Sequence, residues 1–487
     1  MIIKVPETWI TPDSDVRIIP LPSPDSETED GMASTAPQIS AATAHPQPRP
    51  RLNRVLGLPG LTLFGIAYMV PLTVFSTLGP VAKITGNGVP GAYVITLVCM
   101  LFTALSYGRM TRRYPVAGSA YTYAQQSFGG HVGFATGWAL MLDYLLLPMI
   151  NYLLLGLYLR VYLPAVPPEV WVLAGIGLVT ALNVLGIKSV NTFNAAIVVS
   201  QVVFSVIFIV LTLRTVAGDP IPSPAAAFTG MEGIGALFTG AAVLCLSFLG
   251  FDAVSTLSEE AKNPRRDVPR AILAVTFIGG LTFIVLAFMA YLVIPDWHSF
   301  ADVDTASAEV METAGGQFLS IFFAACTISG TLGSALASQA SVSRILYTMG
   351  RDGVLPTPLF GILSRRFGTP VRATLVVSLV SLTALVVPLD LAVSVISFGA
   401  LAAFTMVNLS VVKSYLVDDR RRGPRDLLCY GLLPLVGFAL TLWLWTSLPA
   451  QALTVGGIWL TAGLLYLAIL TRGFRRKPPV LDMKESS

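Results

Sequence analysis

The stretch that decides the fold covers residues 240–270 and reads GAAVLCLSFLGFDAVSTLSEEAKNPRRDVPR. It places one aspartate, Asp252, inside an apolar run that ends in a charged turn with two prolines. An ionisable residue at the centre of a lipid-spanning helix costs about 2.5 to 3.5 kcal/mol, so Asp252 should face protein, water or a ligand. Gly250 favours local unwinding of the backbone beside it. We therefore predict a membrane helix that is broken at a binding site.

The composition is typical of an integral membrane protein. Of the 487 residues, 54% are hydrophobic and 12% are charged, and the mean hydropathy is +0.72. Soluble proteins carry about 25% charged residues. The net charge of +4 is small and scattered, so no nucleic-acid partner is expected. Four cysteines and three histidines stand far apart, so we predict no disulfide framework, no metal site and no cofactor.

The first 57 residues differ from the rest of the chain. Residues 1–57 are rich in proline and carry an acidic patch, which predicts a disordered cytoplasmic tail. No apolar region follows the start, so no signal peptide is expected. Translation from Met32 instead of Met1 stays open, because a run of small residues follows Met32.

Twelve apolar stretches follow, and each is long enough to cross a bilayer core, which takes roughly 20 residues. They cover residues 58–82, 90–108, 131–158, 168–186, 192–214, 234–258, 270–294, 317–347, 372–389, 391–413, 427–447 and 452–471. If both termini are cytoplasmic, 28 of the 31 lysines and arginines lie on the inner side, as the positive-inside rule requires. The sequence thus predicts a multi-pass protein of the cell membrane bilayer, with cytoplasmic tails at 1–57 and 473–487.

The first span is also interrupted, at residues 71–80. Pro71 removes a helical hydrogen bond, and Gly79 with Pro80 limits the helix beyond it. Two broken spans that are five apart indicate an inverted-repeat transporter. We predict an all-α fold whose first repeat covers 58–214 and whose second covers 232–414, with two further spans over 426–472.

A second acid lies inside the membrane, near the middle of span 3. This residue is Asp143, and Tyr144 follows it. Asp143 and Asp252 are the only carboxylates in the span interiors, and no lysine or arginine lies at that depth. Two such acids require a bound cation, a proton or cavity water. A diamine offers one ammonium to each, and aromatic rings attract cations. Alternatively, Asp143 accepts hydrogen bonds from neighbouring helices and contacts no cargo.

The predicted cargo site draws on spans 1, 3 and 6. Its members are Thr73, Phe75, Ser76, Asp143, Tyr144, Ser247, Phe248, Phe251 and Asp252. Asp252 is also the predicted proton-coupling group, because an acid at a site of varying polarity can exchange a proton for a cation. Glu259 and Glu260 are predicted to form an inner gate or surface ion pairs. Small residues along span 8 indicate close helix packing, with a sodium site as the alternative.

Three separated motifs resemble those of the amino acid, polyamine and organocation (APC) permeases. They are residues 115–123 (PVAGSAYTY), 259–270 (EEAKNPRRDVPR) and 343–353 (SRILYTMGRDG). Residues 71–75, 142–144 and 247–253 are similar to the bacterial putrescine importers of that superfamily, although Ser76 stands where those importers have an acid. The resemblance covers about residues 55–475. It implies a leucine-transporter-like fold, no enzymatic activity, and diamine uptake driven by a proton gradient.

Two transport hypotheses follow. The first is a secondary transporter that imports a small organic cation, in the first place putrescine, by proton symport with alternating access. The second is a proton-coupled α-amino-acid permease, whose cargo carboxylate favours a glycine-rich break; residues 73–76 contain no glycine. An integral membrane enzyme or receptor is disfavoured, because the spans hold no nucleophile with a base and no large soluble domain exists. The sequence does not predict the oligomeric state.

Overall fold

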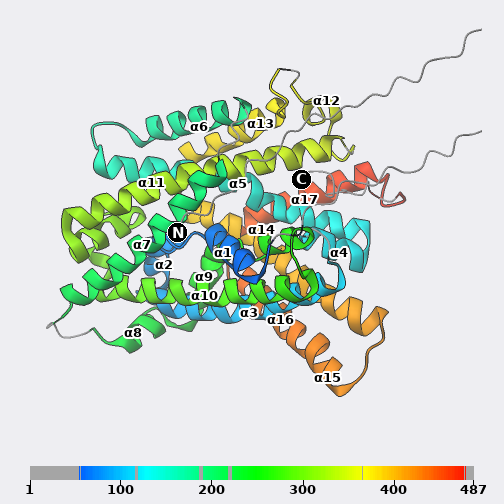
Figure 1. Cartoon of the computed structure of the whole chain (residues 1–487), viewed down its shortest axis with the longest axis horizontal. Coiled ribbons are helices and arrows are strands. Elements are labelled where there is room, and N and C mark those ends of the chain that lie inside the picture. The colour runs from blue at the N-terminus through cyan, green and yellow to red at the C-terminus, as the bar shows by residue number, and fades with distance from the viewer. Residues whose placement is uncertain are drawn as a thin grey trace, which may run out of the picture. The chain divides into compact units, whose positions relative to one another are not determined.

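The computed structural model describes residues 54, 56–115, 119–185, 190–217, 222–351, 353–364, 366–476 and 478. The side chains of residues 190–198 and 259 lie outside that description. The predicted N-terminal tail, apart from residues 54, 56 and 57, lies outside it too, as does most of the chain beyond residue 476. Within the described ranges the regular elements are helices, and Figure 1 shows their arrangement.

The long helices follow the predicted spans in order. They are α1 (Leu58–Met69) with α2 (Thr73–Thr85), α3 (Val89–Arg113), α5 (Gly130–Tyr162), α6 (Pro168–Leu185), α7 (Val190–Thr215), α9 (Gly233–Val243) with η1 (Leu244–Phe248) and η2 (Ala253–Glu259), α10 (Pro264–Val293), α11 (Ala306–Arg351), α13 (Val371–Ser381) with η5 (Leu382–Leu385), α14 (Leu389–Val412) with η6 (Lys413–Asp418), η7 (Leu427–Leu432) with α16 (Leu433–Thr446), and α17 (Ala450–Leu470). The connections carry α4 (Ala120–Phe128), α8 (Pro224–Thr229), η3 (Trp297–Ser299), η4 (Val303–Thr305), α12 (Thr357–Phe360) and α15 (Pro424–Asp426).

Helix length and hydropathy support twelve membrane spans. In the described ranges, nine helical segments are long and apolar enough to cross a membrane. The pair α1 and α2 passes the same test as one span bent by 46°. Two shorter apolar helices, Val199–Thr215 and Val371–Leu385, coincide with predicted spans 5 and 9. Together these segments match the twelve predicted stretches one by one.

Both predicted breaks are present, and they lie against each other. Between α1 and α2 the backbone leaves the helix at Val70, whose φ is 51°, and Pro71 follows. The predicted limit at Gly79 and Pro80 is wrong, because α2 continues through both residues to Thr85. Span 6 loses α-helical geometry after Val243 and turns at Gly250, whose φ is 122°. A Cβ atom added to Gly250 would lie 2.6 Å from Cδ1 of Tyr68, so only glycine permits this close approach. The sequence therefore brings two irregular backbone segments together in the membrane interior.

Two groups of helices surround these breaks. In the first group, α10 runs along α3, and α1 packs on α10 (Figure 1). In the second group, α5 packs against α11, α14, α6 and α13. A buried amide, Gln339, joins members of the second group, because its Oε1 accepts from Tyr152 Oη at 2.9 Å and its Nε2 donates to Ser378 Oγ at 2.7 Å. Satisfied buried polar networks of this kind hold helices in a fixed register.

Candidate functional site

The two intramembrane aspartates lie in the same region of the membrane interior. Asp143 lies midway along α5 and is 6% exposed, and Asp252 lies at the span 6 break, directly before η2. The two carboxyl groups are close enough to interact through space. Gly399 of α14 packs on the α5 backbone at this level, where an added Cβ would lie 2.6 Å from the Ala139 carbonyl oxygen. That close packing holds the Asp143 segment of α5 against α14.

Asp143 has hydrogen-bonding capacity that the described protein groups leave unused. Its Oδ1 atom is buried and has no hydrogen-bond partner among the described residues. Asp252 is half-buried, and its Oδ1 accepts from the Gly250 backbone amide at 3.1 Å. Neither carboxyl group takes part in an ion pair with a described basic residue. A buried carboxyl group without a partner is costly, so this arrangement suits a bound cation, a proton or water.

The last turn of α9, directly before the span 6 break, accepts hydrogen bonds from hydroxyl groups of two other helices. Thr96 of α3 donates to the Ala241 carbonyl at 2.9 Å, and Ser397 of α14 donates to the Val243 carbonyl at 3.0 Å. The carbonyl end of a helix carries partial negative charge. Such an end, together with the unwound carbonyls beyond it, favours cationic cargo over anionic cargo.

Three tyrosines lie within electrostatic range of both aspartates, and we refer to them with Asp143 and Asp252 as the acidic site. Tyr68, Tyr107 and Tyr144 each interact electrostatically with both carboxyl groups. The hydroxyl of Tyr107 is buried and lacks a hydrogen-bond partner among the described residues. Of these three tyrosines, only Tyr144 was predicted from the sequence as a site residue. Tyr68 has a local signal that was missed, since it lies three residues before Pro71; Tyr107 has none.

The predicted site residues of span 6 contact different neighbouring helices. Phe251 packs edge-on against Tyr107, with ring centroids 5.5 Å apart, and so borders the acidic site. Phe248 instead packs edge-on against Phe283 of α10 at 5.6 Å. The Ser247 hydroxyl forms a 2.9 Å hydrogen bond with Tyr93 and is fully buried. Ser247 and Phe248 therefore attach the span 6 break to α3 and α10.

The predicted residues of span 1 form the start of α2. The Thr73 hydroxyl donates to the Met69 carbonyl at 3.2 Å, across the break, and Ser76 is half-buried. Phe75 is 2% exposed and is enclosed by aromatic rings of α7 and α11. Those rings belong to Phe204, Phe208 and Phe323, with centroids 5.3 to 6.2 Å from that of Phe75. This aromatic cluster packs α2 against α7 and α11.

The predicted inner gate is described only in part. The side chain of Glu259 lies outside the described residues. At Glu260 the backbone carbonyl accepts from the Leu56 amide at 3.0 Å, and the Lys262 amide donates to the Leu56 carbonyl at 2.8 Å. The segment before α1 is therefore fastened to the turn that follows span 6.

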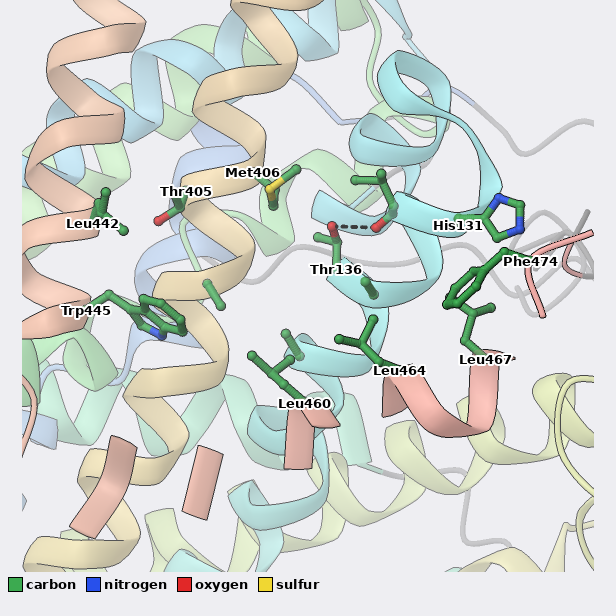
Figure 2. Close-up of a pocket in the computed structure, with 14 residues that line it drawn as sticks. His131, Thr136, Thr405, Met406, Leu442, Trp445, Leu460, Leu464, Leu467 and Phe474 are labelled. Atoms are coloured by element: carbon green, nitrogen blue, oxygen red, sulfur yellow. Dashed lines mark hydrogen bonds between the residues drawn. The ribbon is translucent and has the colours of Figure 1, made fainter. Parts of the chain in front are cut away.

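An apolar cavity of about 400 Å³ lies elsewhere, between α5, α14, α16 and α17 (Figure 2). Figure 2 shows Trp445 at one side of it and His131 beside Phe474 at the other. No carboxylate or lysine lines this cavity, and neither aspartate of the acidic site does. Its chemistry suits a hydrocarbon chain and not a polar cargo.

Known proteins with similar sequences are membrane permeases and importers. The profile of the amino acid permease family matches residues 60–417. The chain is 40% identical over 439 residues to the low-affinity putrescine importer PlaP of Escherichia coli strain K12, covering 88% of this chain and 96% of the importer. It is 29% identical to the branched-chain amino acid permease BcaP of Bacillus subtilis strain 168, covering 86% and 94%.

The fold has a counterpart among solved structures. The crystal structure of MhsT in complex with L-phenylalanine aligns with a TM-score of 0.57 at 13% sequence identity. The alignment covers 82% of this chain and all of that chain. This likeness concerns the fold alone, and it confirms the predicted all-α, leucine-transporter-like class with discontinuous first and sixth spans.

Proposed function

The chain belongs to the amino acid permease family and is a secondary transporter of the APC type, and we propose that it imports putrescine by proton symport. The transporter is a multi-pass membrane protein and not an enzyme. The proposed orientation places both termini in the cytoplasm, following the lysine and arginine distribution. The proposed repeats cover 58–214 and 232–414.

The observation that carries this proposal is the buried Asp143 carboxyl oxygen without a hydrogen-bond partner among the described residues, in a site where the carboxyl group of Asp252 lies within electrostatic range. Two acids in one low-dielectric site favour a cargo with two positive charges, because each ammonium then has its own partner. The tyrosine rings and Phe251 provide apolar and π surface for the alkyl chain between the ammonium groups. A diamine satisfies both requirements at once.

Proton coupling is assigned to Asp252. It lies at the irregular backbone of span 6, where a change of helix position alters its surroundings, whereas Asp143 lies within a continuous helix. An acid in such a place can hold a proton when no cation is bound and release it when the surroundings change. The inward gradient of protons then drives cation uptake.

The accessibility of the acidic site supports alternating access. On the α1 side of the site, the Tyr68 side chain is 43% exposed. On the α2 side, Phe75 and its aromatic cluster are buried, and the Tyr158 hydroxyl closes on Ser307 at 2.5 Å. With the proposed cytoplasmic termini, the buried α2 side would be the side that faces the outside. Rocking of one helix group against the other would exchange the two sides.

The second candidate is an α-amino-acid permease, and the similarity to the branched-chain amino acid permease of Bacillus subtilis favours it. An amino acid also needs a site for its carboxylate. Such a site is built most readily from successive backbone amides. Two carboxyl groups without a described ion-pair partner would repel that carboxylate, so we rank this function second.

Uptake into proteoliposomes tests the proposal. Vesicles that contain the purified full chain receive labelled putrescine, with and without an inside-alkaline pH gradient. We expect accumulation that depends on the gradient and that unlabelled diamines compete for better than monoamines or leucine. Failure of putrescine to accumulate, while leucine accumulates under the same gradient, would exclude the diamine assignment. Accumulation without any effect of the gradient would exclude proton symport.

A further inference from the structure

A second cavity, which is polar, lies apart from the acidic site. It has a volume of about 310 Å³ and is formed by the end of α3, the start of α10, η6, α15 and η7. Three arginines line it, namely Arg109, Arg112 and Arg425, and Asp426 is the one acid in its lining. We call it the arginine pocket. The transport proposal uses none of these residues.

Arg109 carries an unused donor in this pocket. Its Nη1 atom is buried and has no hydrogen-bond partner among the described residues. Its guanidinium carbon lies 5.9 Å from the ring centroid of Tyr430. A charged donor that is removed from water without an acceptor is rarely tolerated in native structures. The pocket therefore offers a buried charged donor to an acceptor from outside the described chain.

Aromatic packing holds the pocket wall in place. Tyr430 stacks on Tyr415 with centroids 4.2 Å apart and an interplanar angle of 2°. The Tyr415 hydroxyl donates to the backbone carbonyl of Arg109 at 3.1 Å. The position of Arg109 is thus set by two elements that are about 300 residues distant in sequence. This is a built site and not a chance gathering of flexible surface arginines.

Positive charge exceeds negative charge around the pocket. Arg112 is close enough to Arg109 for the two guanidinium groups to repel each other. Arg421 lies over the Tyr430 ring at 5.6 Å. The nearby carboxylate of Asp419 is already paired with Arg113 at 2.5 Å, so it does not neutralise the pocket. An anion with several acceptor oxygens would relieve both the repulsion and the unused donor.

We propose that the arginine pocket binds the phosphate of an anionic phospholipid headgroup. The planar guanidinium fork of arginine matches phosphate oxygens. Leu428 and Leu432, on the same segment as Tyr430, are 49% and 56% exposed, so an apolar surface for acyl chains adjoins the pocket. The lysine and arginine distribution places this end of the helices in the cytoplasmic leaflet, where basic pockets between spans recognise lipid headgroups.

A bound headgroup would connect helices that the proposed transport cycle moves relative to one another. Arg109 and Pro269 belong to α3 and α10 of the first helix group, whereas Tyr415 and Arg425 belong to the segments around α14 and α16. The lipid would therefore bridge the first group and its neighbours at one end of the molecule. Lipid binding can be measured without a transport assay, so a failure of this proposal is distinguishable from a failure of the proposed transport function.

Native mass spectrometry of the full chain in detergent tests the proposal. The protein is titrated with dioleoyl phosphatidylglycerol and, separately, with dioleoyl phosphatidylcholine. The pocket variant is Arg109→Gln with Arg425→Gln. The control is Arg265→Gln with Arg266→Gln, which removes the same charge from two exposed arginines at the start of α10. We expect the first phosphatidylglycerol to bind at least tenfold more weakly to the pocket variant and unchanged to the control.

A further variant and two competition measurements distinguish the remaining explanations. Arg425→Glu alone reverses a charge at the exposed rim of the pocket, so it tests the site if the double variant does not fold. Equal loss of phosphatidylglycerol in the pocket and control variants would overturn the proposal. So would equal binding of phosphatidylcholine by the unchanged protein. Displacement of the lipid by millimolar inorganic phosphate or glycerol 3-phosphate would instead assign the pocket to a soluble phosphate and overturn the lipid assignment.

Discussion

Asp252 is the residue on which proton coupling depends. In Asp252→Asn the side chain keeps its size and still accepts from the Gly250 amide, but it can neither ionise nor carry a proton. We expect putrescine uptake to fall about 100-fold and the remaining uptake to lose its dependence on the pH gradient. Asp390→Asn, which removes an exposed carboxylate at the start of α14, is the matched control. Gradient-dependent uptake by Asp252→Asn at the original rate would refute the assignment.

Asp143 distinguishes a diamine from a monoamine. If each carboxyl group holds one ammonium, Asp143→Asn removes the partner of the second ammonium alone. The KM for putrescine should then rise at least tenfold, about 1.4 kcal/mol of binding, while the inhibition constant of butylamine changes less than threefold. Competition assays in proteoliposomes measure both constants. Equal losses for the two amines would show that the two-carboxylate arrangement is wrong.

Only part of the acidic site could be predicted from the sequence. Asp143 and Asp252 stand out because carboxylates within apolar spans are rare and costly. Tyr107 does not stand out, and Tyr68 has only its place three residues before Pro71 as a signal, because tyrosine is common near membrane interfaces and neighbours in space depend on how each helix is rotated. Phe75 was named as a cargo residue, and its ring packs in an aromatic cluster whose other members lie on α7 and α11. That prediction stays open.

At the scale of elements, the close contact between the two broken spans rests on Gly250. Its φ of 122° is a conformation that L side chains rarely adopt, and a methyl group there would meet Tyr68. Gly250→Ala should therefore cost about 1 to 3 kcal/mol in backbone strain, lower the thermal midpoint and separate α1 from the span 6 break. We expect uptake to fall more than tenfold.

The control for this substitution is Gly457→Ala on α17, where an added methyl group meets nothing within 4 Å. Protein amount and thermal unfolding in detergent are measured beside the uptake rate. A Gly250→Ala transporter with unchanged unfolding and unchanged uptake would show that the contact between the breaks is dispensable.

The spans themselves were predictable because length and hydropathy suffice for helices that must satisfy their own backbone in lipid. Pro71 and Gly250 also marked the two breaks correctly. What the sequence did not reveal is the early loss of α-helical geometry in residues 244–248, which contain neither glycine nor proline. The hydroxyl groups of Thr96 and Ser397, on α3 and α14, donate to carbonyls of the last turn of α9 directly before that segment, and such contacts between helices are invisible in local sequence.

At the scale of the whole molecule, opposite ends of the helix groups are held by different forces. Aromatic burial around Phe75 closes one end, whereas charged pairs concentrate at the other. There Arg113 at the end of α3 forms a bidentate pair with Asp419, with distances of 2.5 and 2.9 Å, in the connection between α14 and α16. This contact fastens the first helix group to the segments beyond α14.

The pH dependence of this pair can be predicted with its sign. The hydrogen bond from Arg113 holds the pKa of Asp419 below its ordinary value, which is about 3.9 in an unfolded chain. A carboxyl group whose pKa is lower in the folded state adds stability above the unfolded pKa and loses it as the pH falls through the folded pKa. Because both side chains are partly exposed, the contribution is about 0.2 to 1 kcal/mol.

Asp419→Asn should therefore lower the thermal midpoint in detergent at pH 7, and the difference from the unchanged protein should shrink as the pH falls below about 4. Added salt should shrink it as well, because the pair is screened. The control is Glu312→Gln, an exposed acid for which no ion pair is described, and it should show neither trend. A difference that grows toward acidic pH would mean that Asp419 is destabilising in its ionised form. The Arg113–Asp419 pair would then not stabilise the attachment of the first helix group to its neighbours, and that attachment would rest on packing.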